Sequence, residues 1–165
     1  MSKSSRKKSK KGEDHEPRIE NRRARYDYAI GDTLECGVKL VGTEVKAIRN
    51  GHVSLNEGYV RATDEPPRLT LHGVHVGEYP PAGPARQHEA VRVRQLLAHK
   101  REIRKLAQAT REKGTTIVPL KLYFSRGRIK LLVGIGRGKS RVDKRQDIAK
   151  KEAKREIERA LSRRR

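Results

Sequence analysis

Hydrophobic and polar residues alternate in the middle of the chain, and this alternation predicts β-strands. Every second residue from Thr33 to Leu40 is apolar, or nearly so, which is typical of a half-buried strand. Two later segments alternate in the same way around the turn-forming residues Ser125–Gly127, which predicts a hairpin. Shorter runs at 59–63 and 68–72 predict two more strands. The buried faces would be Leu34, Cys36, Val38 and Leu40 in the first strand, Val118, Leu120, Leu122 and Phe124 in the first hairpin strand, and Ile129, Leu131, Val133 and Ile135 in the second.

Two other segments have apolar residues at the three- and four-residue spacing of a helix. The first is residues 42–51, where Thr43 would cap the N-terminus and Gly51 would end the helix. The second is residues 93–113, which Gly114 follows. The sequence therefore predicts two helices attached to a set of antiparallel strands.

This set of elements favours a mainly β fold, namely a closed barrel of the OB type with appended short helices, an architecture that often binds oligonucleotides. Hydrophobic residues are concentrated between Tyr26 and Ile135, so the barrel would occupy residues 21–136. Residues 1–20 include a Lys- and Ser-rich stretch and are predicted to form a disordered basic arm. Residues 137–165 would be a basic C-terminal tail.

The chain is strongly basic, with 41 Lys and Arg residues against 20 Asp and Glu residues and a net charge of +21. The tail has few large apolar residues, so it cannot bury enough surface to fold alone. Its apolar residues form only a thin stripe at helical spacing over residues 147–161. We therefore predict a tail that is disordered in the free protein and becomes helical against a polyanion, for which RNA is the best candidate.

Residues that could support catalysis or hold a metal ion are scarce. His72 and His75 would point to opposite faces of a strand, and no Cys or carboxylate completes a metal site with them. The segment Gly134–Gly138 lacks the ending of a phosphate-binding loop at the right offset, and it predicts instead the end of a strand and a flexible exit into the tail. We predict no enzyme activity, no cofactor, no metal and no small-molecule substrate.

The cysteine content and hydropathy bear on location. The single cysteine, Cys36, excludes an internal disulfide and suits a reducing environment, so we expect a cytoplasmic protein. No apolar run approaches the roughly 20 residues that a bilayer-spanning helix needs, so no membrane partner is predicted.

Glu35 is a carboxylate on the outward face of its predicted strand in an otherwise basic domain. One interpretation is an ordinary solvated strand residue. The other is a hydrogen-bond acceptor for base edges or ribose hydroxyls, where Lys and Arg could only hold phosphate. Aromatic residues are only 4% of the chain, which argues against base stacking along a single strand and favours recognition of a folded RNA.

Blocks of sequence along residues 20–150 match those of a known family in the same order. They are Asn21-Arg-Arg-Ala-Arg25 followed by Tyr28, Glu35-Cys-Gly37, Gly42-Thr-Glu-Val-Lys46, Leu55 with Tyr59-Val60, Leu96-Leu97-Ala-His-Lys-Arg-Glu-Ile103, Val118-Pro-Leu-Lys-Leu-Tyr-Phe124, and Gly138-Lys139 with Asp143-Lys-Arg145. Through these blocks the chain resembles the bacterial small protein B family, the SsrA-binding proteins that partner transfer-messenger RNA. The resemblance implies an OB-type barrel that binds the tRNA-like domain of this RNA. It also implies a non-enzymatic adaptor for trans-translation, the rescue of stalled ribosomes.

The resemblance further implies which residues bind RNA. The predicted set in the barrel, drawn from the matching blocks and one basic position beyond them, is Asn21, Arg22, Arg23, Arg25, Glu35, Lys46 and Lys130. The tail would enter the decoding region of the small ribosomal subunit and the empty mRNA channel. Its predicted ribosome-binding residues are Gly138, Lys139, Asp143, Lys144 and Arg145, with Lys150, Lys151, Lys154 and Arg155 neutralising rRNA phosphate.

The chain departs from the family pattern at two tail positions. Val142 stands where many members have His or Tyr, so a stacking role there does not transfer, and Ser140 stands where a second lysine is common. The alternative function is a general RNA chaperone or nucleoid-type nucleic-acid binder that uses the same basic surface without specificity. Such a protein would lose affinity steeply with salt and would show little preference among folded RNAs.

Overall fold

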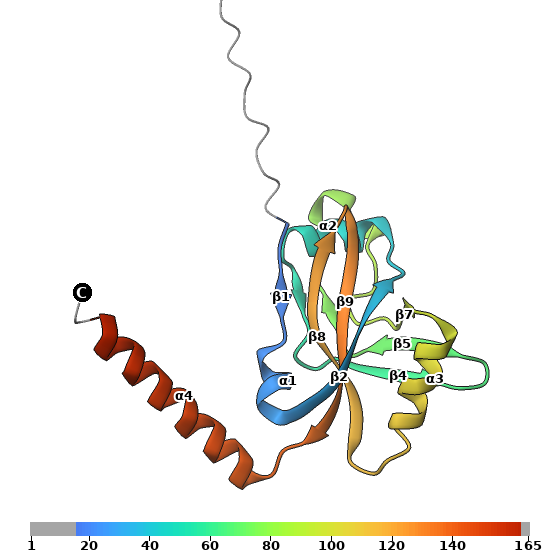
Figure 1. The fold of residues 1–165 in the computed structure, drawn as a ribbon. Helices are drawn as coiled ribbons and strands as arrows, with labels where there is room; N and C mark the ends of the chain where they lie inside the picture. Colours follow the sequence, from blue (N-terminus) through green and yellow to red (C-terminus); the bar gives the residue numbers. More distant parts are fainter. Residues whose placement is uncertain (1–15, 163–165) are drawn as a thin grey trace, which may run out of the picture.

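The computed structural model describes residues 16–162, which form a mixed α/β structure with a strongly curved antiparallel sheet (Figure 1). The strands are β1 (Ile19–Glu20), β2 (Tyr28–Val38), β3 (Val53–Ser54), β4 (Tyr59–Thr63), β5 (Arg68–His72), β6 (His75–Val76), β7 (Arg94–Leu97), β8 (Thr115–Ser125) and β9 (Arg128–Gly138). The helices are α1 (Arg22–Asp27), α2 (Gly42–Arg49), α3 (Lys100–Ala109) and α4 (Arg141–Ser162), with the short 3-10 helices η1 (Pro80–Ala82) and η2 (Pro84–Arg86). The expected mainly β class is therefore only partly confirmed, because α4 alone contributes 22 residues of helix.

Seven strands form one sheet in the order β1-β8-β4-β5-β7-β2-β9, and a further pairing joins β8 to β9. This pairing closes the order on itself, so the sheet is a nearly complete ring whose longest strands are β2, β8 and β9. The two-residue turn of the β8–β9 hairpin is Arg126–Gly127, and both residues have positive φ, 50° and 72°, as a type I′ turn requires. The predicted hairpin is confirmed.

The core lies inside the ring. The predicted inward faces of the first strand and of β9 are confirmed, since the four residues predicted for each belong to or pack against the main buried cluster. In β8, by contrast, the register shifts between Pro119 and Lys121. Val118 and Leu120 therefore pack in a second cluster with Ala24 of α1, whereas Leu122 faces the main core. The predicted single inward face of β8 is wrong because a bulge of this kind reorients the side chains around it. The second cluster packs α1 against the outside of β8.

The predicted helix over residues 93–113 is wrong in its first part. Residues Arg94–Leu97 form β7, which pairs with both β2 and β5, and α3 begins only at Lys100. Within β7, Leu96 is buried and Leu97 is exposed, which is the two-residue period of a strand. The apolar residues of this short segment are spaced in a way that suits either a helix or a strand. Pairing with β2 on one side and β5 on the other makes it a strand.

The predicted helix over residues 42–51 is confirmed as α2, but Thr43 is not its cap. Val41 is the N-cap residue, and its N–H donates to the carboxylate of Glu44 at 2.9 Å. The hydroxyl of Thr43 instead forms a 2.9 Å hydrogen bond with His88. The start of α2 is thus held from inside the helix by Glu44.

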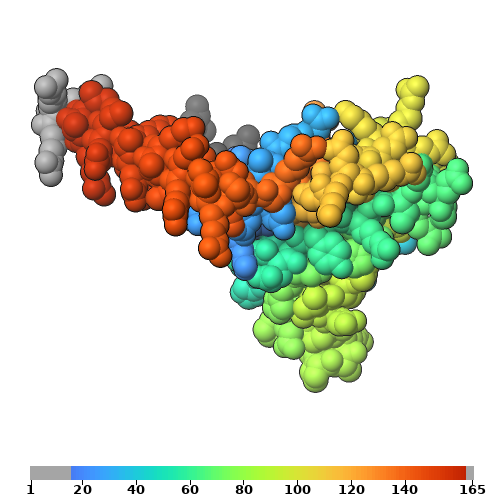
Figure 2. All heavy atoms as spheres, turned by 90° about the horizontal axis from the view of Figure 1, so that it is seen from below, coloured from blue at the N-terminus to red at the C-terminus, as the bar shows by residue number. Residues whose placement is uncertain are grey.

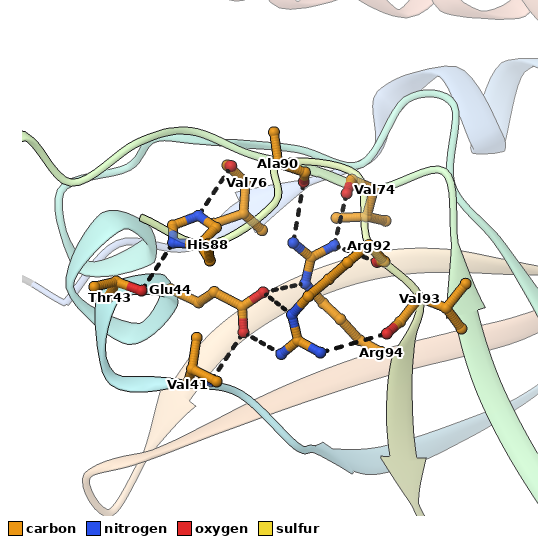
Figure 3. A network of polar contacts seen from close by, with 10 residues as sticks. All are labelled: Val41, Thr43, Glu44, Val74, Val76, His88, Ala90, Arg92, Val93 and Arg94. Carbon is orange, nitrogen blue, oxygen red and sulfur yellow. Dashed lines mark hydrogen bonds and ion pairs between the residues drawn. The ribbon is translucent and has the colours of Figure 1, made fainter. Parts of the chain in front are cut away.

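Glu44 is also the centre of a buried ionic network that joins α2 to the segment leading into β7 (Figure 3). Its carboxylate is completely buried and accepts hydrogen bonds from Nε of Arg92 and Nε of Arg94, each at 2.8 Å. Arg94 is 1% exposed, and its remaining N–H groups donate to main-chain oxygens of Val74, Ala90 and Arg92. Charges are tolerated in a core only when paired and hydrogen-bonded in this way. The network fixes the start of β7 against α2 and against the main chain at Val74 and Ala90.

The ends of the barrel differ from the predicted boundaries. The arm was predicted over residues 1–20, but its last two residues, Ile19 and Glu20, form β1 and pair with β8 in the sheet. Residues 1–15 of the predicted arm lie outside the described residues. At the other end β9 continues to Gly138, two residues past the predicted limit of 136, so Gly134–Gly138 is strand rather than a flexible exit. No helix within residues 16–162 is long and apolar enough to span a membrane.

Helix α4 leaves the barrel as an arm (Figure 1; orange to red in Figure 2). It begins at Arg141, before the predicted start of the apolar stripe at 147, and residues 163–165 lie outside the described residues. None of its side chains is buried. The tail is helical over Arg141–Ser162 in the structure without RNA, which differs from the disorder expected of the free tail. A gain of helix on binding stays a prediction.

Candidate nucleic-acid interface

Three side chains from three adjacent strands meet on the outside of the barrel. Glu35 lies on β2, Lys130 on β9 and Tyr123 on β8, and the strand register places Tyr123 directly opposite Lys130. The Tyr123 hydroxyl donates a hydrogen bond to the Glu35 carboxylate, and Lys130 Nζ lies 3.2 Å from Glu35 Oε1. The Glu35 side chain remains 46% exposed, so the carboxylate is held in place and still open to a ligand. These three residues are called the Glu35 patch below.

The contacts within the Glu35 patch fix its charge state. The hydrogen bond from Tyr123, and then that from Lys130, lower the pKa of Glu35, so it is an anion at neutral pH. The same bond to Glu35 raises the pKa of Tyr123 to about 12, which keeps the phenol protonated as a donor. The carboxylate therefore presents acceptor sites only, and suits N–H groups of bases or ribose 2′-hydroxyls.

The surroundings of the Glu35 patch supply cations and open apolar surface. Lys121 Nζ lies 4.8 Å from the centre of the Tyr123 ring. Lys130 also lines a hollow of about 450 Å³ that it shares with the exposed side chain of Leu97 and with Arg128. An acceptor flanked by cations can read one polar group of an RNA while the cations hold neighbouring phosphates.

Asn21, predicted to hold RNA, lies beneath α1 and is only 2% exposed. Its Nδ2 donates to the main-chain oxygens of Leu55 and Pro119, both at 2.9 Å. Its Oδ1 accepts from the N–H of Ala24 at 3.0 Å and so caps α1. The polar atoms of this side chain are used inside the protein. In the structure Asn21 positions α1, and its predicted role in holding RNA stays a prediction.

The arginines of α1 are all exposed. Arg23 pairs with Glu57 at 2.5 Å and with Asp27 at 3.4 Å. Arg22 and Arg25 instead face a cleft of about 390 Å³ between α1 and α4. The cleft is lined by Arg22, Arg25, Tyr26, Asp147, Ile148, Lys151, Glu152 and Arg155. Residues predicted for the barrel and for the tail thus line the same basic cleft, from α1 and from α4. None of the residues of the Glu35 patch lines it.

Lys46 lies in a third place. Its Nζ is 5.1 Å from the centre of the Tyr79 ring, at an open hollow of about 830 Å³ beside the start of α2. Arg86 and His88 also line this hollow. The predicted RNA-binding residues of the barrel therefore do not line one common pocket: Lys130, Arg22 with Arg25, and Lys46 each line a different one.

The first predicted tail residues contact the barrel. Lys139 donates from its main-chain N to Asp27 O at 2.9 Å and from Nζ to Arg25 O at 2.9 Å, and it pairs with Asp147 at 2.7 Å. Lys144 Nζ lies 2.7 Å from Asp27 Oδ1. Gly138 is the last residue of β9, opposite Tyr28. These tail residues are therefore engaged with the protein itself.

Ser140 and Asp143 form a capping box at the start of α4. The Ser140 hydroxyl accepts from the N–H of Asp143 at 3.2 Å, and the Asp143 carboxylate accepts from the N–H of Ser140 at 3.1 Å. The Ser140 hydroxyl also donates to the Asp143 carboxylate at 2.7 Å, and this bond, followed by that from the Ser140 N–H, lowers the pKa of Asp143. Ser140, a departure from the family pattern, therefore has a structural role here. Of the other predicted tail residues, those exposed along α4 are Arg145, Lys150, Lys151, Lys154 and Arg155.

Three residues of these surfaces were missed from the sequence: Tyr123, Tyr26 and Asp27. Tyr123 could have been found, because it lies on the polar face of its alternating strand, one residue from Leu122. Tyr26 and Asp27 have no local signal, since their importance comes from tail residues more than 100 positions away. Among residues 16–162 no cluster of His, Cys, Asp or Glu side chains is suited to a metal ion.

Comparisons with known proteins agree on one family. A family model described as SmpB protein matches residues 18–163. An SsrA-binding protein of Thermobifida fusca is 50% identical over 159 residues, which cover 96% of this chain and 98% of the relative. One from Thermosynechococcus vestitus is 47% identical over 145 residues, covering 88% and 94%. A solved structure described as "tmRNA-SmpB: a journey to the center of the bacterial ribosome" superposes with a TM-score of 0.64 at 41% identity, covering 80% of this chain and 94% of that one.

Proposed function

Since this chain belongs to the SmpB family of SsrA-binding proteins, we propose that it binds transfer-messenger RNA and acts with it in trans-translation, the rescue of stalled ribosomes. The observation that supports this most is the near full-length match to SsrA-binding proteins. Like its family, the protein acts by binding RNA and is not an enzyme. We expect it in the cytoplasm, where ribosomes work.

The Glu35 patch and the basic cleft support a division of labour within the chain. We propose that the ring of strands is an OB-type barrel whose outer face grips the tRNA-like domain of the RNA, with Glu35 as acceptor and Lys130, Arg22, Arg23 and Arg25 as cations. Lys46, in its separate hollow, would contact a different part of the RNA. A carboxylate pinned between a tyrosine and a lysine offers more specificity than a basic surface alone.

The tail has the properties expected of a segment that works in an rRNA-lined channel. Helix α4 is basic, free of buried side chains and, apart from the half-buried Lys144, exposed along its length. We propose that its outer part gains helix as rRNA phosphate neutralises Lys150, Lys151, Lys154 and Arg155, and that it occupies the decoding region and the empty mRNA channel. Neighbouring cations repel one another in the free helix, so their neutralisation by phosphate would favour helix formation.

Truncation after Ser140 tests the division of labour, because it removes α4 while keeping all of β9 and the contacts of Lys139 with the main chain of α1. We expect affinity for the tRNA-like domain to be nearly unchanged and tagging of stalled chains to be lost. Loss of tight RNA binding in the truncated protein would show that the barrel does not bind alone.

A salt titration with competitor separates this function from that of a general RNA chaperone. A specific adaptor keeps its preference for a tRNA-like fold over a duplex of equal length as salt rises, although both affinities fall. Equal affinity for the two RNAs at every salt concentration would favour the non-specific alternative.

A further inference from the structure

A small polar crevice lies between α1 and the segment that leads into β4. It holds about 200 Å³, and its lining includes Arg23, Glu57 and Tyr59. Pockets for drug-sized ligands hold roughly 300–1,000 Å³, so this crevice suits a smaller group such as a single nucleobase. None of its lining residues belongs to α4, so the crevice does not depend on whether the tail is helical or disordered.

Tyr59 gives the crevice an aromatic wall, and its side chain is 49% exposed. Its register partner on β5, His72, stacks against the Tyr59 ring with ring centres 5.0 Å apart and ring planes 10° apart. The His72 ring is held in turn, because its Nε2 lies 2.9 Å from the Thr70 hydroxyl. β5 lies on one side of β4, while β8, on which α1 packs, lies on the other, so the crevice meets the face of Tyr59 that His72 leaves open. Such a backed ring is a platform on which an unpaired base can stack.

The polar side of the crevice places a donor beside two acceptor oxygens. Arg23 Nη1 lies 2.5 Å from Glu57 Oε1, and Arg23 Nε lies 3.4 Å from Asp27 Oδ2. Over residues 16–162 the structure shows no partner for Nη2 of Arg23 or for Oε2 of Glu57. The free edge of this pair therefore offers N–H of the guanidinium next to both oxygens of the carboxylate. Guanine alone among the four bases presents the complementary order on its Watson–Crick edge, namely the acceptor O6 followed by the donors N1–H and N2–H.

Asn21 joins the two walls of the crevice from below. Its Nδ2 donates to the main-chain oxygen of Leu55 at 2.9 Å, and the N–H of Gly58 donates to the same oxygen at 3.0 Å. The turn that carries Glu57 is thereby tied to the residue that caps α1, the helix that carries Arg23. A site whose groups are held in place before the ligand arrives loses less entropy on binding. The buried Asn21 thus supports the crevice without touching its ligand.

We propose that this crevice binds an unpaired guanine base of an RNA, stacked on Tyr59, with O6 accepting from Arg23 and with N1–H and N2–H donating to Glu57. It is called the guanine crevice below. The inference deepens the function proposed above, since the base would belong to an RNA on which the protein acts. One base taken from a folded RNA also agrees with the low aromatic content of the chain. Transfer-messenger RNA and rRNA are the two possible sources, and the last experiment below separates them.

A nucleotide titration of the free protein tests the guanine crevice without transfer-messenger RNA or the ribosome. The full chain labelled with 15N is titrated with GMP, IMP and AMP, and the amide signals of Gly58 and Tyr59 are followed by NMR. The three nucleotides carry the same phosphate, so binding to the basic surface in general is common to all of them. We expect GMP to bind about tenfold more tightly than IMP, which lacks the N2 amino group, and AMP to bind more weakly still. Equal affinities for GMP and AMP at these signals would overturn the proposal.

Three variants assign the contacts. Glu57→Gln should lower the affinity for GMP about tenfold and abolish its preference over AMP, because the amide cannot accept both N–H groups. Tyr59→Leu should lower GMP affinity about tenfold, whereas Tyr59→Phe should retain it, since only the ring is needed for stacking. The Glu57 side chain is 75% exposed and Tyr59 is 49% exposed, so the signals of the core should stay in place. The matched control is Glu112→Gln, which alters another exposed carboxylate–arginine pair and should leave GMP binding unchanged.

The unlabelled variants are then compared in affinity for the tRNA-like domain and in tagging of stalled chains. If Glu57→Gln and Tyr59→Leu lower that affinity about tenfold, the guanine belongs to transfer-messenger RNA. If the affinity is kept and tagging falls about tenfold, the guanine belongs to rRNA. Full affinity together with full tagging in both variants would overturn the role of the crevice in RNA binding. If the parent neither bound the RNA nor supported tagging, the proposed function would fail, while the nucleotide titration would still decide whether the crevice binds guanine.

Discussion

The barrel and helix α4 are stabilised by different interactions. The barrel is a nearly complete ring of strands around a buried apolar core, and the fully buried Glu44 and Arg94 form a network beside it. Helix α4 has 22 residues and no buried side chain, and the contacts at its base are the Ser140 capping box and the ion pair between Lys144 and Asp27. One region is ordered by burial, and the other by a few polar contacts at its base.

This difference teaches what a charged residue can do in each region. Inside the barrel a charge must be paired, because desolvation is costly, so its loss affects folding. Along α4 the charges face water, where single ion pairs contribute little to stability. Substitutions in α4 should therefore change function while leaving the stability of the barrel intact, and substitutions in the network should do the reverse.

The largest expected effect is on stability, from Glu44→Gln. It leaves the buried Arg94 without its carboxylate partner, and breaking a buried ion pair costs about 3–5 kcal/mol of unfolding free energy. Urea denaturation measures this. The control is Glu112→Gln, which removes an exposed pair with Arg137 and should cost under about 1 kcal/mol. Equal costs for the two variants would show that the network is not a structural element of the barrel.

The titration of Glu44 sharpens this prediction. Burial raises its pKa, but hydrogen bonds from Arg92, the Val41 N–H and Arg94 outweigh burial and hold the pKa below the ordinary value of 4.5. A carboxyl whose folded pKa is depressed contributes stability above its unfolded pKa, and this contribution is lost as pH falls towards the folded value. The stability difference between the parent and Glu44→Gln should therefore shrink below pH 4.5, as urea denaturation across that range would show.

The next effect is confined to α4. Prolines at Ala153 and Ile157 each cost a helix interior about 3 kcal/mol, so the outer part of α4 cannot form helix. We expect the urea midpoint of the barrel and its RNA affinity to be unchanged and tagging to be lost. Full tagging would mean that the tail works as an extended basic strand, and a lowered midpoint would mean that α4 contributes to the barrel's stability.

The sequence predicted the parts of the barrel that follow from local patterns. The alternation in β2 and β9 placed their inward residues correctly, and it placed Glu35 on the outward face. It could not show the bulge in β8 or the strand nature of β7, because both depend on pairing with strands that are distant in the sequence. The Glu44 network was hidden for the same reason, since Glu44 and Arg94 are 50 positions apart.

The candidate site, like the barrel, was predicted from the sequence only in part. Glu35 and Lys130 are indeed in contact, but their link through Tyr123 needed three strands in register. Asn21 shows the opposite case, in which a residue of the matching blocks is buried and caps a helix. Sequence blocks identify positions that matter to the molecule, and only the structure separates those that face a ligand from those that hold the surface in shape.

Within the barrel surface, Glu35→Ala should weaken binding of the tRNA-like domain about tenfold at moderate salt, because a specific hydrogen-bond acceptor is lost. The direction is informative, since removing a negative charge would strengthen purely electrostatic binding. Tyr123→Phe, which removes only the hydroxyl that pins the carboxylate, should have a smaller effect of the same sign. If Glu35→Ala bound the RNA as tightly as the parent, Glu35 would be an ordinary solvated strand residue and not an acceptor for RNA.

The smallest effect should come from the base of α4. Ser140→Ala removes the side-chain acceptor for the Asp143 N–H, and loss of an N-cap costs a helix about 1 kcal/mol. Amide hydrogen exchange should therefore speed up in the first turns of α4, while exchange in β2 and β9 stays unchanged. Ser140→Asp is the matched control, because aspartate also caps helices and should keep the slow exchange, although it brings a second carboxylate near Asp143. If Ser140→Ala left exchange in α4 as slow as in the parent, the cap would not stabilise the start of the helix, and the contacts of Lys139 and Lys144 with α1 would have to hold it.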